Sequence, residues 1–263
     1  MIATSVSKSQ WVTFFRPVPD AKLRLFCFPY AGGTSLTYRA WPLGLPADVE
    51  VCAIQLPGHG TRLHEPLFDR LTPLLDDLAP NLVPYLNKPF VFFGHSMGAL
   101  LAFELSRRLR RDYARLPKHL FISGHRPAQT RDSKKRTFDL PEPEFIEELR
   151  RLNGTPTEVL EHPELLEVMI PVLRADFAIA QTYQYVDEQP LECDLTAFGG
   201  ISDTTVNREH LEVWQTHTSG KFKLRMFLGD HFYLHSARTS LLQTIALDLR
   251  QLIGDSNGRI KTW

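Results

Sequence analysis

Ser96 is the residue whose surroundings most clearly suggest chemistry. It lies at the centre of the pentapeptide Gly-His-Ser-Met-Gly at residues 94–98, directly after the apolar and aromatic run 89–93. Apolar residues at helical spacing follow over residues 99–111. A serine between a strand and a helix in a Gly-x-Ser-x-Gly pattern is typical of a nucleophile elbow. The pattern therefore predicts that the Ser96 hydroxyl is exposed at the carboxyl end of a strand.

The glycines of this pentapeptide have a steric purpose. A turn this sharp brings backbone atoms close together, so side chains at positions 94 and 98 would clash. The amide of Met97 begins the next helix beside the hydroxyl and can stabilise a negatively charged oxygen. We expect a second amide donor at Ala31, because it lies in a glycine turn after a predicted strand at 22–28. The alternative for this turn is a plain strand exit.

A serine becomes an effective nucleophile when a histidine accepts its proton and a carboxylate holds that histidine in one tautomer. In the α/β-hydrolase arrangement the acid and then the histidine follow the serine along the chain, each after a late strand. Asp203 and His231 occupy these positions, after predicted strands at 193–199 and 222–228. We therefore predict a catalytic triad of Ser96, Asp203 and His231, which needs no metal or redox cofactor.

Other acids and histidines fit this order less well. His59 follows an early strand, so we interpret it as structural or as part of the pocket rim. Asp230 precedes His231 in the same turn and is poorly placed to reach its ring. His217 lies before the last predicted strand, and His235 lies beyond the turn that carries His231.

The elements that must position these residues alternate between strands and helices. Apolar runs predict strands at 22–28, 49–56, 89–93, 119–123, 193–199 and 222–228. Amphipathic spacing predicts helices at 71–86, 99–111, 208–216 and 241–252. Strands alternating with helices indicate an α/β fold, with a mostly parallel sheet and helices on both of its faces.

Residues 128–190 interrupt this alternation and predict an inserted helical lid. Two helical patterns occur there, one ending at Asn153 and one running from 163 toward 185, with Pro171 expected to kink or break the second. The wide apolar surface of the second pattern could cover an apolar substrate as well as the sheet, or serve only packing within the lid.

The chain is therefore divided into a hydrolase core at 1–127 and 191–263 and a lid at 128–190. Within the lid, Phe145, Met169 and Phe177 are the residues that we expect to shape an acyl pocket.

Composition excludes several classes of protein. The formal net charge is zero, which gives no sign of binding to nucleic acid or to an anionic membrane. Two basic runs, Arg107 to Arg115 and Arg131 to Arg136, are either solvated faces or a docking patch for an acidic partner. Three cysteines far apart favour buried thiols. With no secretion signal and no apolar stretch long enough to span a bilayer, we expect a cytoplasmic protein and a monomer.

Five motifs in chain order carry a resemblance to a known family. They are Phe28-Pro29-Tyr30-Ala31-Gly32-Gly33, Gln55-Leu56-Pro57-Gly58-His59-Gly60, Phe93-Gly94-His95-Ser96-Met97-Gly98, Gly199-Gly200 with Asp203, and Gly229-Asp230-His231-Phe232. Together they resemble the type II thioesterases of the α/β-hydrolase superfamily, the discrete editing enzymes of polyketide, nonribosomal-peptide and antibiotic biosynthesis. The resemblance extends from about residue 15 to 253.

This resemblance implies both a substrate and a partner. The substrate would be an acyl thioester on the phosphopantetheine arm of an acyl or peptidyl carrier protein, and hydrolysis would remove stalled or wrong acyl groups. The family's triad corresponds to Ser96, Asp203 and His231, and its oxyanion donors correspond to Ala31 and Met97. Carrier proteins are typically acidic, so either basic run could dock one.

Three other functions remain open from the sequence. An intracellular carboxylesterase would favour an oxygen ester, and an acyltransferase would pass the acyl group to an acceptor other than water. A non-catalytic binding module is a third alternative, which the ordered serine, aspartate and histidine disfavour. Neither the acyl length nor the synthase served follows from the sequence.

Overall fold

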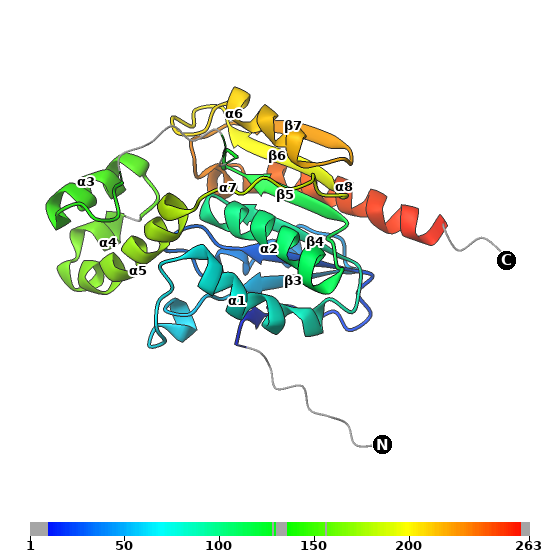
Figure 1. Ribbon diagram of the computed structural model, residues 1–263, viewed down its shortest axis with the longest axis horizontal. Coiled ribbons are helices and arrows are strands. Elements are labelled where there is room, and N and C mark those ends of the chain that lie inside the picture. The colour runs from blue at the N-terminus through cyan, green and yellow to red at the C-terminus, as the bar shows by residue number, and fades with distance from the viewer. Residues whose placement is uncertain (1–9, 128, 130–135, 156, 259–263) are drawn as a thin grey trace, which may run out of the picture.

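The computed structural model describes residues 10–127, 129, 136–155 and 157–258. Within these residues seven strands form one sheet in the order β1-β3-β2-β4-β5-β6-β7 (Figure 1). The strands are β1 (Val12–Thr13), β2 (Leu23–Phe28), β3 (Val49–Ile54), β4 (Phe90–His95), β5 (His119–Ser123), β6 (Asp194–Gly200) and β7 (Phe222–Phe227). All neighbours pair in parallel except β1, which is antiparallel to β3. The predicted, mostly parallel sheet is confirmed.

Helices cover both faces of this sheet. α1 (Leu71–Leu82) and α2 (Met97–Tyr113) pack on one face, and α8 (Arg238–Gly258) packs on the other (Figure 1). Alternate residues of each inner strand face opposite layers, so that Phe28 contacts the first layer and Cys27 the second. The inner strands are therefore buried on both sides, which explains their continuous apolar sequences.

Three helices between β5 and β6 form a separate group at the left of Figure 1. They are α3 (Glu142–Leu152), α4 (Thr157–Glu161) and α5 (Pro163–Thr182). Their apolar faces share a small core of their own. The expected break at Pro171 does not occur, because α5 continues through it. A proline removes one backbone hydrogen bond from the helix, and the burial of its neighbours Ile170 and Val172 offsets the free energy that this loss costs.

Short elements complete the described chain. They are the 3-10 helices at Ser35–Tyr38, Trp41–Leu43, Gly60–Arg62, Val83–Tyr85 and Val213–His217, and the helices α6 (Arg208–Glu212) and α7 (Tyr233–Ser236). The predicted helix over 71–86 therefore ends at Leu82 and continues as a 3-10 turn. The predicted helix over 208–216 is likewise an α-helical turn followed by a 3-10 turn.

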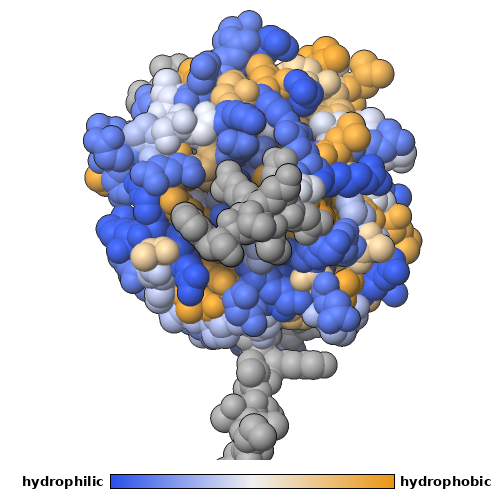
Figure 2. All heavy atoms as spheres, turned by 90° about the vertical axis from the view of Figure 1, so that its right-hand side faces the viewer, coloured by the Kyte–Doolittle hydropathy of each residue, from blue (hydrophilic) through white to orange (hydrophobic). Residues whose placement is uncertain are grey.

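The surface opposite α3–α5 is mixed in character. Figure 2 shows hydrophobic residues on it in several small groups, separated by hydrophilic ones. No helix in the described ranges is long and apolar enough to cross a membrane. The cavity that could bind a substrate lies at the other end of the molecule, between the sheet and α3–α5.

Candidate active site

The turn at Ser96 has the strained geometry of a nucleophile elbow. Ser96 has φ 54° and ψ −119°, between the end of β4 and the beginning of α2. A Cβ atom on Gly94 would lie 2.0 Å from the carbonyl oxygen of Gly98, and one on Gly98 would lie 2.2 Å from that of Phe28. The Ser96 amide donates to the Ser123 carbonyl at 2.8 Å, which ties the turn to β5. Only glycine fits at positions 94 and 98, two residues before and two residues after the serine.

The predicted acid and base lie in contact. His231 Nδ1 donates to Asp203 Oδ2 at 2.6 Å, since a carboxylate can only accept. The other carboxylate oxygen, Oδ1, accepts from the Thr205 amide at 2.7 Å, the Thr205 hydroxyl at 2.7 Å and the Val206 amide at 3.1 Å. Four donors therefore fix the carboxylate after β6, and the carboxylate in turn fixes the tautomer of the histidine after β7.

The electrostatics of this pair favour a charged carboxylate. Burial alone would raise the pKa of the Asp203 carboxyl, because it disfavours the ionised form. The hydrogen bonds from His231 and Thr205 outweigh burial and hold that pKa below its usual value. Asp203 therefore stays ionised at neutral pH and accepts the hydrogen bond from His231 Nδ1.

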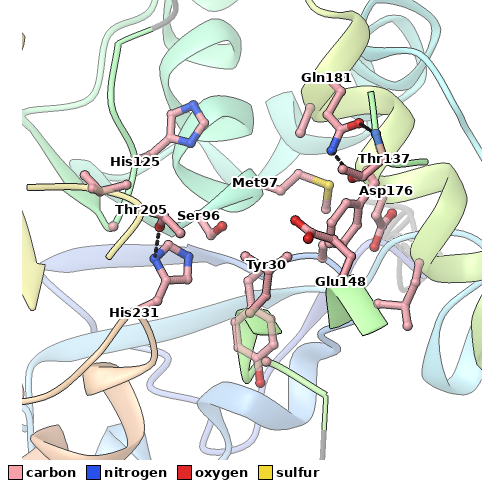
Figure 3. A pocket seen from close by; sticks show the side chains of 18 of the residues that line it. Tyr30, Ser96, Met97, His125, Thr137, Glu148, Asp176, Gln181, Thr205 and His231 are labelled. Carbon is pink, nitrogen blue, oxygen red and sulfur yellow. Dashed lines mark hydrogen bonds between the residues drawn. The ribbon is translucent and has the colours of Figure 1, made fainter. Parts of the chain in front are cut away.

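Ser96 and His231 open into the same cavity, with a volume of about 670 Å³. Figure 3 shows the serine hydroxyl and the imidazole facing one another across its floor, while the side chains of α5 form the opposite wall. Ala31 and Met97 also line this cavity. Neither of their amides donates a hydrogen bond within the described part of the chain, so both are available to a substrate oxygen.

The residues expected to shape an acyl pocket have different positions. Phe177 lines the cavity, whereas Phe145 and Met169 are not among its lining residues. The Phe145 ring is fully buried between α3 and α5, where it packs edge-on against Phe177 with ring centroids 5.6 Å apart. Met169 packs on the same small core. Because α3 and α5 turn part of their apolar faces toward one another, a direct role of Phe145 and Met169 in an acyl pocket stays a prediction.

Asp176 on α5 is a buried acid that the sequence did not single out. Its Oδ2 accepts from the Gly32 amide at 2.7 Å and lies 2.9 Å from His59 Nε2, and its side chain is only 1% exposed. It thus joins α5 to the loops after β2 and β3. An isolated acid within an apolar helical pattern gives no sign of partners so distant along the chain.

The surroundings of His59 favour its charged form. Its Nδ1 lies 2.8 Å from the Pro57 carbonyl and its Nε2 faces the Asp176 carboxylate, so both nitrogens have acceptors. Burial alone would lower the pKa of His59, but the hydrogen bond and the charge of Asp176 raise it above its usual value. The interpretation of His59 as structural agrees with this buried ion pair.

The end of α3 contacts the loop of the predicted base. Asn153 Nδ2 donates to Asp230 Oδ2 at 3.0 Å, and Gly154 packs against the Phe232 ring. A Cβ atom on Gly154 would lie 2.3 Å from Phe232 Cζ, so a larger residue here would require the Phe232 ring to move. Asp230 therefore binds α3 and the Phe232 amide, which leaves Asp203 as the partner of His231.

The first basic run is largely neutralised within the molecule. Glu188 pairs with Arg107 at 3.2 Å, Arg110 at 3.0 Å and Arg111 at 2.7 Å, while Arg108 pairs with Asp76. These contacts hold the segment that leads from α5 back to β6 against α2. Most of the second run, residues 131–135, lies outside the described residues.

Arg107 is the most deeply buried arginine of this run. It donates to the Val186 carbonyl and pairs with Glu104 at 2.5 Å, with its guanidinium over the rings of Phe103 and Tyr185. Its side chain is only 3% exposed. Val186 and Glu188 lie far from this run in sequence, so a charge count alone cannot separate this clamp from a docking patch.

A parallel sheet with a strained serine after β4, an acid after β6 and a histidine after β7 defines an α/β-hydrolase. A family model described as "Thioesterase domain" matches residues 23–249. The chain belongs to this thioesterase family, and the resemblance to type II thioesterases is confirmed.

Relatives along most of the chain agree with this assignment. Linear gramicidin dehydrogenase LgrE of Brevibacillus parabrevis is 44% identical over 256 residues, covering 96% of this chain and 97% of the relative. Gramicidin S biosynthesis protein GrsT of Aneurinibacillus migulanus is 42% identical, covering 89% and 91%. The structure of the type II thioesterase BorB from the borrelidin biosynthetic cluster has a TM-score of 0.82 at 34% identity, covering 90% and 96%.

Proposed function

We propose that this protein hydrolyses acyl thioesters carried on the phosphopantetheine arms of acyl or peptidyl carrier proteins and so removes stalled or wrong acyl groups. The proposal rests on thioesterase family membership and on the similarity to a type II thioesterase and to two proteins of gramicidin pathways. The word dehydrogenase is part of the name of LgrE and is not carried over to this chain. A serine on an elbow beside a histidine bound to a carboxylate supports acyl transfer to water here.

The proposed roles follow the geometry of the site. Ser96 Oγ attacks the thioester carbonyl while His231 accepts its proton, and the amides of Ala31 and Met97 stabilise the oxyanion. His231 then protonates the departing sulfur, which releases the pantetheine thiol and leaves the acyl group on the serine. Water attacks this ester with His231 as the base, and the acid departs as the proton returns to Ser96. Asp203 orients His231 and stabilises its cation throughout.

The lid and the core have separate tasks in this proposal. Residues 1–127 and 191–263 supply the reacting groups, and residues 128–190 enclose the acyl chain. The observation that carries the proposal is the 2.6 Å hydrogen bond from His231 to Asp203, because His231 lines the same cavity as Ser96. Because Ser96 is the proposed nucleophile, Ser96→Ala should remove most turnover and leave the fold intact. A Ser96→Ala variant with a near-native rate would contradict the mechanism.

A substrate panel tests the function. The purified protein is incubated with carrier proteins that bear acyl thioesters of graded length, and the release of free acid is measured. The matching oxygen esters are assayed in parallel, since a carboxylesterase would prefer them. Product analysis with added amine and alcohol acceptors tests for an acyltransferase, which would form an amide or ester. Preferential release of free acid from the thioesters is the expected result.

A further inference from the structure

Two arginines on the wall of the cavity have no partner of opposite charge among the described residues. Arg126 follows β5 and Arg136 precedes α3, and both line the cavity that contains Ser96. Neither guanidinium makes an ion pair or hydrogen bond with any of the residues that the structure describes, in contrast to the paired arginines on α2. Arg126 is half-buried and Arg136 is exposed, so both lie where the cavity meets solvent.

The other charges around the cavity are compensated locally. Arg151 forms two hydrogen bonds with Glu148, at 2.6 and 2.8 Å, on the same turn of α3. Asp176 is bound by His59 and by a backbone amide. The net electrostatic effect of the described lining residues therefore comes from Arg126 and Arg136, and it attracts an anion.

Hydrogen bonds of the residues next to the two arginines fix the backbone at both positions. Gln181 Oε1 on α5 accepts from the Thr137 amide at 2.7 Å, and its Nε2 donates to the Thr137 hydroxyl at 2.6 Å (Figure 3). This fixes the residue next to Arg136. On the other side, the carbonyl of His125 accepts from the Trp214 indole at 2.6 Å, which fixes the residue before Arg126.

We propose that Arg126 and Arg136 bind the phosphate of the phosphopantetheine arm at the entrance of the cavity, an inference that rests on the proposed function. The phosphate is the anionic group of that arm, and the rest of the arm is a neutral amide chain that ends at the thioester. Guanidinium groups bind phosphate oxygens through paired, charge-assisted hydrogen bonds. With the phosphate held at the entrance, the thioester at the end of the arm is free to reach Ser96. The two arginines therefore select substrates by the phosphopantetheine arm rather than by the acyl group.

The test uses two small substrates that differ only in the phosphate. Acyl-4′-phosphopantetheine and acyl-pantetheine with the same neutral acyl group are assayed with the wild type and with Arg126→Gln, Arg136→Gln and the double variant. Each lost arginine should lower kcat/KM for the phosphorylated substrate about fivefold, discounted for partial exposure. The loss should fall on KM, disappear with acyl-pantetheine, and shrink as salt is added.

Matched controls separate phosphate binding from general charge. The double variant Glu148→Gln/Arg151→Gln removes a lining arginine together with its carboxylate partner and leaves the net charge of the lining unchanged, so it should not distinguish the two substrates. Arg126→Lys and Arg136→Lys keep the charge and should restore part of the preference. Equal losses on both substrates would overturn the proposal.

A binding measurement keeps this inference distinct from the proposed function. Phosphopantetheine and pantetheine, without acyl groups, are titrated into Ser96→Ala protein with and without the two arginine substitutions. Tighter binding of phosphopantetheine that depends on Arg126 and Arg136 is expected. If the wild type hydrolyses carrier thioesters but no such difference is found, this inference fails alone. If carrier thioesters are not hydrolysed while the difference is found, the proposed function fails instead.

Discussion

Asp203→Asn is a sharp test of the proposed catalytic residues, because the structure determines how the new amide must lie. Three donors from Thr205 and Val206 converge on Oδ1, so the amide oxygen has to occupy that position. The amide NH₂ group then faces His231 Nδ1, where a carboxylate oxygen accepted at 2.6 Å. An NH₂ group is a donor, so it stabilises the tautomer of His231 that carries its proton on Nε2. That nitrogen can no longer accept the proton of Ser96.

The expected loss is large because the wrong tautomer removes the general base altogether. The same change in a serine protease lowers kcat by about 10⁴ with the geometry intact, and we expect about 10³- to 10⁴-fold here. This range corresponds to roughly 4 to 5.5 kcal/mol of activation free energy. Asp203→Ala imposes no tautomer, so it should lose rate without the added penalty of a misplaced donor.

The assay measures kcat for a neutral acyl-carrier thioester across pH, together with thermal unfolding to show that the variant is folded. The pKa of Asp203 lies below its usual value, so the wild-type rate should not fall through titration of this carboxyl near neutral pH. A folded Asp203→Asn protein with a kcat within tenfold of wild type would refute the role of this carboxylate. Thr205→Val is the matched control, because it removes one donor to Oδ1 but leaves the acceptor facing His231.

Three further predictions concern stability. Gly98→Ala forces a methyl group against backbone carbonyls and should lower the free energy of unfolding in urea by roughly 3 kcal/mol, whereas Gly254→Ala, in open space on α8, should raise it by about 1 kcal/mol. His59→Gln should flatten the pH dependence of that free energy. The pKa of His59 is raised in the folded state, so its protonation stabilises the fold fully at pH values below the unfolded-state pKa near 6.5. This stabilisation is lost as pH rises through the folded-state pKa. Arg107→Met should lower the thermal midpoint by about 5 °C, and the half-exposed Arg111→Met by far less.

Contrary results are equally specific. Equal stability of the two glycine variants would contradict the steric account of the elbow. An unchanged slope of stability with pH after His59→Gln would contradict a charged His59. A midpoint unaffected by Arg107→Met would mean that the clamp on the segment after α5 adds nothing to stability.

The sheet and the elbow were predictable because their signals are local. Buried strands give apolar runs. The elbow needs two glycines at fixed spacing, because a Cβ atom at either position would lie within about 2.2 Å of a backbone oxygen. The order of serine, acid and histidine then follows from the strand order. β1 and α4 were missed because two and five residues are too short to show a period.

The contacts of the inserted helices could not be predicted in the same way. Asp176 binds a backbone amide 144 residues earlier in the chain, and Arg110 donates to Glu188, 78 residues later. A run of charges or a single buried acid has no period that indicates such partners. Phe145 shows the same limit, because an apolar helical face indicates burial but not whether a neighbouring helix or a substrate covers it.

The contacts between α3–α5 and the core bear on how the cavity can open. Asp176 binds the amide of Gly32, which is the residue after the proposed oxyanion donor Ala31. Gly154 packs on Phe232, which is the residue after His231. These helices therefore touch the two loops on which the proposed chemistry depends, and a movement of either helix end changes the surroundings of a reacting group. We therefore expect substrate entry and catalysis to be coupled through these two contacts, with the inserted helices acting as part of the site rather than as a separate cover.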